Sequence, residues 1–409
     1  MSLRDDALQM HKENQGKLEI TPNIKVTNKE ELSLAYSPGV AEPCKEIHED
    51  PRTVYDYTIK RNTVAVVTDG TAVLGLGNIG ASASIPVMEG KAVLFKSFAD
   101  INGVPIALDT KDTEEIIRTV KLISPNYGGI NLEDISAPRC FEIEDRLKKE
   151  TNIPVFHDDQ HGTAIVTMAG LINALRIVDK DLSDIKVVLN GAGAAGIAIV
   201  KLLDSYGVRN MIMCDSRGAI FEGRSYGMND TKDYVAKFTN KDKIEGSLQD
   251  VIKNADVFIG VSVASLLSQD MVKSMADDAI IFAMANPDPE IKPNDAKEAG
   301  AKVVGTGRSD FPNQINNVLA FPGIFRGALD TESTHINEDM KKAAVEAIAN
   351  LIDEDELNPD YCIPGPFDKR VAPSVAREVA KAAMETGVAR IEVDPQKVYD
   401  KTMQLTDLK

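Results

Sequence analysis

The second half of the chain shows a regular alternation of hydrophobic and polar stretches. From about residue 185, short aliphatic runs alternate with segments of helical period. The runs expected to be strands are 185–190, 210–215, 255–260, 279–285 and 301–306. Residues 337–353 and 373–387 have the pattern of closing helices, separated by a proline-rich loop at 358–373. Aliphatic strands that alternate with helices predict a parallel sheet covered on both faces, as in a doubly wound, Rossmann-type domain.

The first half is less regular. The β-branched run at 63–68 is expected to be a buried strand, and so is the apolar run at 91–95. Residues 112–123 predict a helix with Asp112 as its N-cap. Before these, we expect a helix at 2–14 and a loop-rich stretch to about 60. After them, we expect a strand at 128–135 and a surface helix at 138–150. The segment 153–163 is expected to be a strand that ends in a polar loop, and Gly162 then begins an apolar helix that extends to about 178. We place a domain boundary near residue 160, giving an α/β substrate and metal domain at 1–160 and a dinucleotide-binding domain with closing helices at 161–409.

Composition and charge narrow the class of protein. The 409 residues include 46 Lys and Arg against 63 Asp and Glu, a formal net charge of −17. This acid excess argues against nucleic acid and anionic membranes as partners. The four cysteines (Cys44, Cys140, Cys214 and Cys362) form no C-x-x-C pair, which suggests a reducing compartment. With no signal-peptide core and no apolar run of ~20 residues, the expected location is cytoplasmic.

A glycine fingerprint follows the strand expected at 185–190. It consists of Gly191, Ala192, Gly193, Ala194, Ala195 and Gly196, and it precedes a helix and a second strand that ends at Asp215. This order is what a dinucleotide-binding turn requires, because the helix N-terminus faces the pyrophosphate and the acid can bind the ribose. Asp215 favours NAD, whereas Arg217 could receive the 2′-phosphate of NADP, so the cofactor choice stays open.

A second match, Gly75 to Gly80, has a poorer context. Pro86 falls where the following helix should be in mid-course. We therefore interpret this segment as a backbone turn near the active site, with a second dinucleotide site as the alternative.

Acidic residues gather at two expected strand ends. Glu133 and Asp134 end one strand, and Asp158 and Asp159 follow another. Together they would form an oxygen-rich cluster suited to Mg²⁺ or Mn²⁺. The alternative, a zinc site that uses His157 and His161 at i and i+4, needs both histidines on one continuous helix.

Lys91 precedes an apolar run and could be desolvated, which would lower its pKa and allow it to act as a base. Taken alone, such a lysine is more often on the surface.

Taken together, these motifs resemble the malic enzyme family, in particular its short bacterial type. The matching blocks are AYSPGVAEPC (35–44), TDGTAVLGLGNIG (68–80), PVMEGKAVLFK (86–96), NLEDI (131–135), FHDDQHGTA (156–164), NGAGAAG (190–196), FAMANPDPE (282–290) and GTGRSDFPNQINNVLAFPGIFRGAL (305–329). They cover nearly the whole chain in family order.

The resemblance implies a role for each matching position. It makes Tyr36 the general acid and Lys91 the general base, with Asp158 supporting the lysine. The implied divalent-metal ligands are Glu133, Asp134 and Asp159. Asn286 and Asn317 are implied to hold the substrate carboxylate, with Asn316 as a near neighbour, and residues 191–196 form the cofactor loop.

The implied activity is oxidative decarboxylation of (S)-malate to pyruvate and CO₂ with reduction of NAD or NADP, together with decarboxylation of oxaloacetate. Redox-neutral malolactic enzymes belong to the same family but are generally longer. Ala72 departs from the longer eukaryotic relatives, which carry a carboxylate-binding arginine there. A homodimer or homotetramer is also implied. Two alternative functions of a different class are a non-catalytic NAD-binding sensor and a zinc hydrolase.

Overall fold

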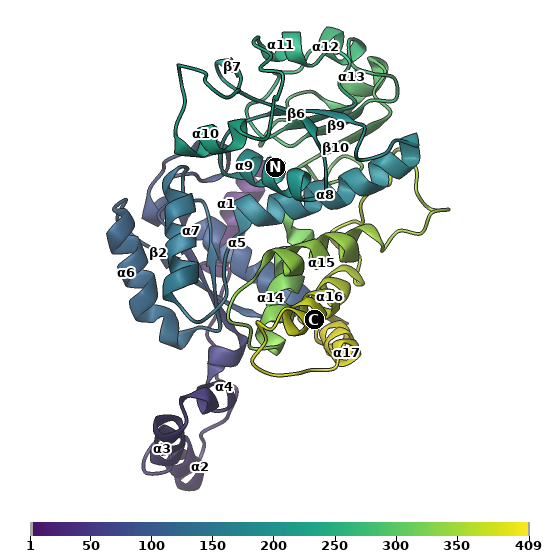
Figure 1. Cartoon of the computed structure of the whole chain (residues 1–409). Helices are drawn as coiled ribbons and strands as arrows, with labels where there is room; N and C mark the ends of the chain where they lie inside the picture. Colours follow the sequence, from purple (N-terminus) through teal and green to yellow (C-terminus); the bar gives the residue numbers. More distant parts are fainter. Residues whose placement is uncertain (1–2, 408–409) are drawn as a thin grey trace.

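The computed structural model describes residues 3–407 and contains two parallel β-sheets (Figure 1). The smaller sheet has the order β2-β1-β3-β4. Its strands are β1 (Thr63–Thr68), β2 (Asn102–Ala107), β3 (Gly129–Leu132) and β4 (Val155–His157). β2 is added on one side of β1, and β3 and β4 are added on the other, so the strand order switches between β1 and β3. The loops at such a switch point are where ligands bind in open α/β sheets.

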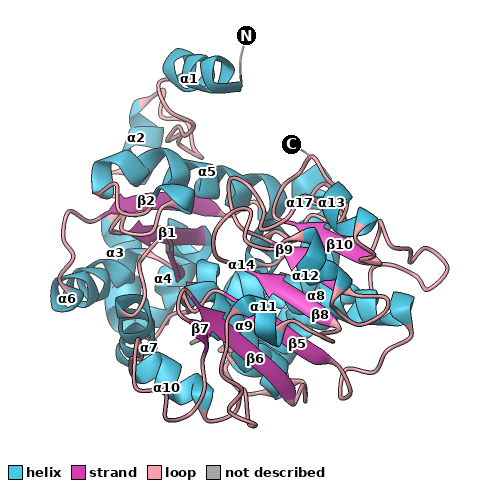
Figure 2. Ribbon diagram, turned by 90° about the horizontal axis from the view of Figure 1, so that it is seen from above, coloured by secondary structure: helices cyan, strands magenta, loops and turns pink. Residues whose placement is uncertain are grey.

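The larger sheet has the order β10-β9-β8-β5-β6-β7. Its parallel strands are β5 (Lys186–Asn190), β6 (Asn210–Asp215), β8 (Val257–Gly260), β9 (Ile280–Ala283) and β10 (Val303–Thr306). All five match expected strands, which confirms the doubly wound domain. The edge strand β7 (Gly218–Ala219) is the exception, because it pairs antiparallel with β6. Figure 2 shows the strands of the two sheets as separate groups.

Helices cover both faces of each sheet. On β1, Val64 and Val66 face α5 (Ala81–Ala99), whereas Ala65 and Val67 pack with α6 (Thr113–Ile123) and α7 (Arg139–Glu150). This alternation is what a strand buried on both sides requires. The larger sheet lies between α8 (Asp158–Val178) and α9 (Ala194–Ser205) on one face and short helices on the other. Those short helices are α11 (Leu248–Val251), α12 (Gln269–Lys273) and α13 (Pro293–Glu298), while α10 (Asp230–Ala236) packs beside α9.

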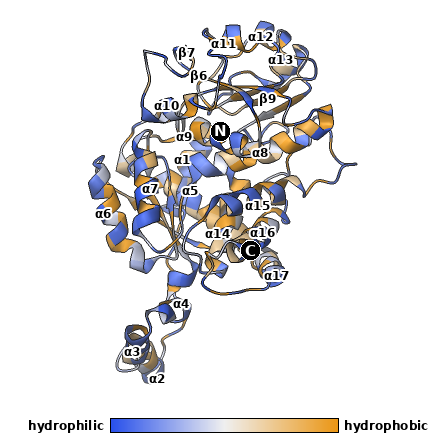
Figure 3. Ribbon diagram, viewed as in Figure 1, coloured by the Kyte–Doolittle hydropathy of each residue, from blue (hydrophilic) through white to orange (hydrophobic). Residues whose placement is uncertain are grey.

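The long helix α8 belongs to the core that joins the two sheets. By length and composition it could cross a membrane, but 67% of its most apolar window is buried inside the structure. Figure 3 shows its hydrophobic colouring against neighbouring helices. Its apolar composition is therefore explained by its place in the protein core.

The C-terminal helices return to the first sheet. The two expected closing helices are present as α15 (Glu338–Ala349) and α16 (Val371–Glu385), and they are joined by α14 (Phe321–Asp330) and α17 (Pro395–Asp407). Phe95 of α5 packs edge-to-face on Phe321 and Phe325 of α14, with ring centroids 4.7 and 5.3 Å apart. The last part of the chain thus covers a helix of the N-terminal half.

Three expectations are wrong. The stretch before residue 60 is not mainly loop, because after α1 (Leu3–Asn14) it forms α2 (Lys29–Ala35), α3 (Ala41–Glu49) and α4 (Val54–Tyr57). Figure 1 shows α2 and α3 on an arm that projects from the body. The run at 91–95 is helical, since α5 begins at Ala81 and continues through Pro86. No polar loop precedes Gly162, because α8 begins at Asp158.

Candidate active site

The four acidic residues expected at strand ends do meet. β3 and β4 pair in parallel, with Leu132 opposite His157, so the residues that follow them emerge at the same edge of the sheet. Glu133 and Asp134 follow β3 directly, and Asp158 and Asp159 form the first turn of α8. An acidic first turn is favourable at a helix N-terminus because the helix dipole is positive there.

Lys91 reaches this cluster from α5. Its Nζ lies 2.6 Å from Asp158 Oδ2 and 3.0 Å from Glu133 Oε1, and its side chain is only 7% exposed. The ammonium also lies 4.3 Å from the centroid of the Phe321 ring. Burial lowers the pKa of Lys91, but Asp158 and Glu133 outweigh it and leave the pKa raised. Lys91 is thus buried, as a base would need to be. Its pKa, however, is raised in the protein without a metal ion, whereas the sequence predicted a lowered pKa.

Glu133, Asp134 and Asp159 have the geometry of a metal site. Each offers a carboxylate oxygen, and the three oxygens lie within 4.8 Å of one another. An all-oxygen set suits Mg²⁺ or Mn²⁺. Burial raises the pKa of Glu133, as does the charge of the neighbouring acids, so a dication would offset a repulsion that Lys91 offsets only in part. The donor chemistry fits the implied cation.

Two residues orient these carboxylates. Asn131 Nδ2 donates to Glu133 Oε2 at 2.8 Å. His157 Nε2 donates to Asp159 Oδ2 at 3.0 Å, since its Nδ1 accepts from Gln160 Nε2. Partners of this kind fix the ligand geometry at metal sites. Sequence reasoning did not assign Asn131, although its place two residues before Glu133 on a strand puts both side chains on one face.

The two histidines do not face one metal. His161 Nε2 lies 2.8 Å from Glu144 Oε1, whereas His157 binds Asp159. Among residues 3–407, the acidic trio alone meets the geometric criterion for a metal cluster. This arrangement does not support the zinc alternative.

The amides Asn286 and Asn317 lie beside the same edge. A Cβ at Gly162 would meet Asp158 Oδ1 at 1.9 Å and Asn317 Cβ at 3.0 Å, so Asn317 is a neighbour of Asp158. A Cβ at Gly75 would meet the Asn286 carbonyl oxygen at 2.5 Å. Thus the loop that holds the second glycine match packs on Asn286.

Asn316 and Ala72 are placed by their hydrogen bonds. Asn316 Oδ1 accepts from Val318 N at 2.9 Å, which makes this side chain a helix cap. The backbone N–H of Ala72 donates to Asp134 O at 2.9 Å. The position that lacks arginine therefore borders the acidic cluster.

The fingerprint glycines have the environments that a dinucleotide turn requires. Gly191 has φ of +124°, and a Cβ at Gly196 would meet the Gly191 carbonyl oxygen at 1.8 Å. A Cβ at Gly193 would meet no atom within 4 Å, so the backbone there is open to a ligand. One glycine makes the turn, one packs helix against strand, and one leaves space for phosphate. Ala192, Ala194 and Ala195 complete the loop that begins α9.

Asp215 ends β6 as expected, but it is already paired. Arg224 Nη1 donates to its Oδ1 at 3.1 Å and Lys232 Nζ to its Oδ2 at 2.7 Å, while the Arg217 N–H donates at 2.9 Å. Burial raises the pKa of Asp215, yet the hydrogen bonds from Arg224 and Lys232 outweigh burial and lower it to about 2. Arg224 and Lys232 were not predicted, because no local pattern places them at this strand end. Because Arg224 and Lys232 offset the charge of Asp215, this carboxylate alone does not decide between NAD and NADP.

This pairing predicts an acid dependence of stability. The pKa of Asp215 is lower in the folded protein than its ordinary 3.8, so its stabilising effect is full above that value and is lost as pH falls toward about 2. Asp215→Asn should therefore weaken the fall of the unfolding midpoint over this range, measured by thermal denaturation. Asp270→Asn is the control, because Asp270 is 91% exposed, and equal pH profiles for wild type and Asp215→Asn would contradict the prediction.

Tyr36 is the one assigned catalytic residue that lies elsewhere. It ends α2 on the projecting arm and is 70% exposed (Figure 1). Lys91 lies on α5 in the body of the molecule. A single chain therefore does not bring the two together.

The sequence matches two models of one family. "Malic enzyme, N-terminal domain" matches residues 15–148, and "Malic enzyme, NAD binding domain" matches residues 160–384. A "Bifunctional malic/malolactic enzyme" of Bacillus subtilis is 72% identical over 99% of both chains. An "NAD-dependent malic enzyme" of Geobacillus stearothermophilus is 61% identical over 92% of this chain and 78% of its own.

A solved structure agrees with these matches. The malic enzyme from Pyrococcus horikoshii superposes with a TM-score of 0.96 at 46% identity, covering 100% of this chain and 96% of that one. The agreement extends over both sheets and the arm, since the whole chain is covered. The chain belongs to the malic enzyme family.

Proposed function

We propose that this protein catalyses the oxidative decarboxylation of (S)-malate to pyruvate and CO₂, with NAD or NADP as oxidant and Mg²⁺ or Mn²⁺ as the metal. The observation that carries the proposal is the contact of Lys91 Nζ with Asp158 and Glu133 beside the trio of metal-type carboxylates. The same site accounts for decarboxylation of oxaloacetate, which needs no hydride transfer. The names of the relatives support malate as the substrate.

Each group has a defined task. A cation on the carboxylates would offset the negative charge that raises the pKa of Lys91, and the neutral amine would then accept the proton of the C2 hydroxyl, with Asp158 holding the lysine at 2.6 Å. Asn286 and Asn317 bind the substrate carboxylate with neutral donors, and Tyr36 returns a proton to C3. A cation held by Glu133, Asp134 and Asp159 would polarise the C2 oxygen and stabilise the charge that develops as CO₂ leaves. NAD or NADP on the loop at 191–196 would supply the hydride acceptor.

Tyr36 needs a second copy of the chain for this role. The arm exposes apolar side chains as well, with Leu34 73% and Leu32 50% exposed. Large exposed hydrophobic residues are concentrated before residue 60: Leu3, Leu8, Met10, Leu18, Ile20, Ile24, Val26, Leu32, Leu34, Tyr36, Val40, Tyr57 and Ile59. Patches of this kind mark protein interfaces. We therefore propose a homo-oligomer, at least a dimer, in which the arm of one chain brings Tyr36 to the site of its partner.

A single assay tests the proposal. Malate is supplied with NAD or with NADP, with and without Mn²⁺, and NAD(P)H and pyruvate are measured. Both products should form in equal amounts, and EDTA should abolish the reaction until Mn²⁺ is returned, because the buried carboxylates lose their dication. Full turnover in EDTA would exclude the carboxylate site. Cofactor binding without any NAD(P)H would favour the sensor alternative.

Redox-neutral conversion of malate to lactate is a second candidate function. It is favoured by the name of the Bacillus subtilis relative, which aligns over 99% of both chains. The expectation that such chains are longer therefore gives no reason to set it aside. The two activities separate by product: lactate formed without accumulation of NAD(P)H indicates the redox-neutral route, and pyruvate matched by NAD(P)H indicates the oxidative one.

A further inference from the structure

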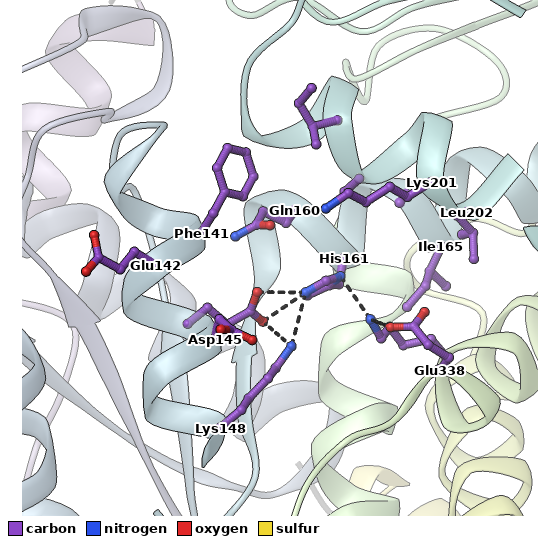
Figure 4. Close-up of a pocket in the computed structure, with 15 residues that line it drawn as sticks. Phe141, Glu142, Asp145, Lys148, Gln160, His161, Ile165, Lys201, Leu202 and Glu338 are labelled. Atoms are coloured by element: carbon purple, nitrogen blue, oxygen red, sulfur yellow. Dashed lines mark hydrogen bonds and ion pairs between the residues drawn. The ribbon is translucent and has the colours of Figure 1, made fainter. Parts of the chain in front are cut away.

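A cavity lies beside the start of α8, the helix whose first turn carries Asp158 and Asp159. It measures about 610 Å³ and is lined by α7, the start of α8, α9 and α15 (Figure 4). It contains His161, which neither the metal site nor the proposed reaction uses. Its charged side chains are thus unexplained by the proposed function.

Three lysines enter the cavity from three helices. Lys148 of α7 and Lys341 of α15 approach His161 from opposite sides, with Nζ 3.5 Å from Nε2 and 3.2 Å from Nδ1. Lys341 is 4% exposed, and it also contacts Glu338 at 2.5 Å. Lysine is rarely buried to this extent unless an anion accompanies it.

Lys201 of α9 is solvent-exposed, and among the three lysines of this lining it is the one without an acidic partner in the described structure. Its Nζ lies 5.0 Å from the ring centroid of Tyr234 and 5.9 Å from that of Phe141, and no carboxylate within residues 3–407 forms an ion pair with it. Figure 4 shows its amine pointing toward Gln160 across the cavity. The four acids of the lining, in contrast, already have basic partners: Glu144 pairs with Lys148, Glu338 with Lys341, Asp145 with Lys149 and Glu142 with Arg146.

The part of the lining beside Lys201 is apolar. Ile165 of α8 and Ile197 and Leu202 of α9 form this wall, with Phe141 at the side. The cavity therefore offers a hydrophobic surface beside an amine that has no counter-ion. Sites of this kind orient a ligand by a few polar contacts and retain it by apolar burial.

We propose that this cavity binds a small organic anion, a phosphate monoester or carboxylate joined to an apolar group, with its head on Lys201 and Lys341 and its body against the Ile165–Leu202 wall. The head would complete the missing ion pair of Lys201 and compete with His161 for Lys341. The apolar group would fill volume that a simple ion leaves empty.

Contacts link this cavity to the metal site. His161 Nε2 bonds to Glu144 Oε1 at 2.8 Å, and the same oxygen accepts the backbone N–H of His157 at 3.1 Å. His157 in turn holds Asp159. An occupant that displaces Lys341 therefore acts on a chain of contacts that ends at a proposed metal ligand, which makes the cavity a regulatory site. This consequence rests on the proposed function, whereas the binding itself does not.

The binding test uses phenyl phosphate as the probe on the full-length protein, with NADH present to fill the cofactor loop. Calorimetry should show saturable binding that weakens at least about tenfold in Lys201→Met. Lys342→Met is the matched control, because Lys342 also lies over a tyrosine ring, 5.5 Å from Tyr206, but outside the cavity. Lys201→Gln also removes the charge but retains a polar side chain, so weak binding in both variants is not explained by a folding defect of Lys201→Met.

Parallel titrations distinguish the ligand chemistry. Benzoate replaces the phosphate head, inorganic phosphate removes the apolar body, and phenol removes the charge. The two aromatic anions should bind more tightly than inorganic phosphate or phenol. Wild-type affinity in both Lys201 variants, or no saturable binding to wild type, would overturn the site.

The regulatory part has its own measurement. The Kd of Mn²⁺, followed by electron paramagnetic resonance, should change severalfold when phenyl phosphate is added, since coupling between two sites is reciprocal. An unchanged Kd would overturn regulation while leaving the binding site intact. Failure of Mn²⁺ to bind at all would instead count against the proposed function.

Discussion

Lys91→Ala is expected to lower malate oxidation by about 10²–10⁴-fold, the range that loss of a general base produces. Lys91 is the one cation in contact with Asp158 and Glu133 in the described structure, and both acids are buried, so no neighbouring group can take its place. The measurement is the steady-state rate of NAD(P)H formation at saturating malate and Mn²⁺. A rate close to that of wild type would remove Lys91 from the mechanism.

The control for this variant lies on the same helix. Lys96 pairs with Asp100 at 2.7 Å but is 44% exposed, and Lys96→Ala should retain nearly full activity. Lys91→Ala also leaves two buried carboxylates without their partner, which costs about 3–5 kcal/mol in comparable sites. Its thermal midpoint should therefore be measured together with activity, and Lys91→Arg, which keeps the charge, separates a lost base from a weakened fold.

Two inactive variants should restore activity when they are mixed. If Tyr36 acts in the partner's site, a mixed dimer of Tyr36→Phe and Lys91→Ala contains one site with both residues intact. Random exchange makes half of the dimers mixed, and each has one working site in two, so activity should recover to about a quarter of wild type. The measurement is malate turnover after the chains are unfolded and refolded together.

A second mixture supplies the control. Lys91→Ala and Asp159→Asn both damage the body of the molecule, so every site in their mixed dimers lacks one group and the mixture should stay inactive. Recovery in this control, or none in the first mixture, would contradict the shared site. The first mixture thus tests the position of the arm independently of the chemistry at Lys91.

Local pattern was sufficient for most strands and for the cofactor loop, but it did not predict β2 or the short edge strand β7. Strands such as 63–68 and 185–190 are β-branched or aliphatic runs bounded by polar residues, and burial on both faces leaves little ambiguity. The run at 91–95 has the same composition but is helical. What decides it is topology: β1 and β2 are parallel neighbours, and their crossover requires a helix between them.

The part of the candidate site that follows directly after strands could be predicted from the sequence. Glu133, Asp134, Asp158 and Asp159 follow adjacent parallel strands, so their proximity follows from the order of the sheet. The pairing of Asp215 with Arg224 and Lys232 depends on how a long loop folds back, which no spacing rule encodes. The pKa of Lys91 was misjudged because the sequence argument considered burial alone: the resemblance named Asp158 as the supporting acid, but the contact with Glu133 was not predicted.

The position of α8 links the acidic residues of the site to the stability of the whole fold. Its first turn carries Asp158 and Asp159, and the turns that follow are buried between the two sheets, with Ile165, Val166 and Leu171 fully enclosed. Segments with this density of buried contacts open only together with the entire fold, unlike loops that fluctuate locally. The acids at the site therefore have no independent local unfolding route. Heat should inactivate the enzyme and melt it at the same temperature, because the same helix anchors the catalytic acids and joins the hydrophobic core.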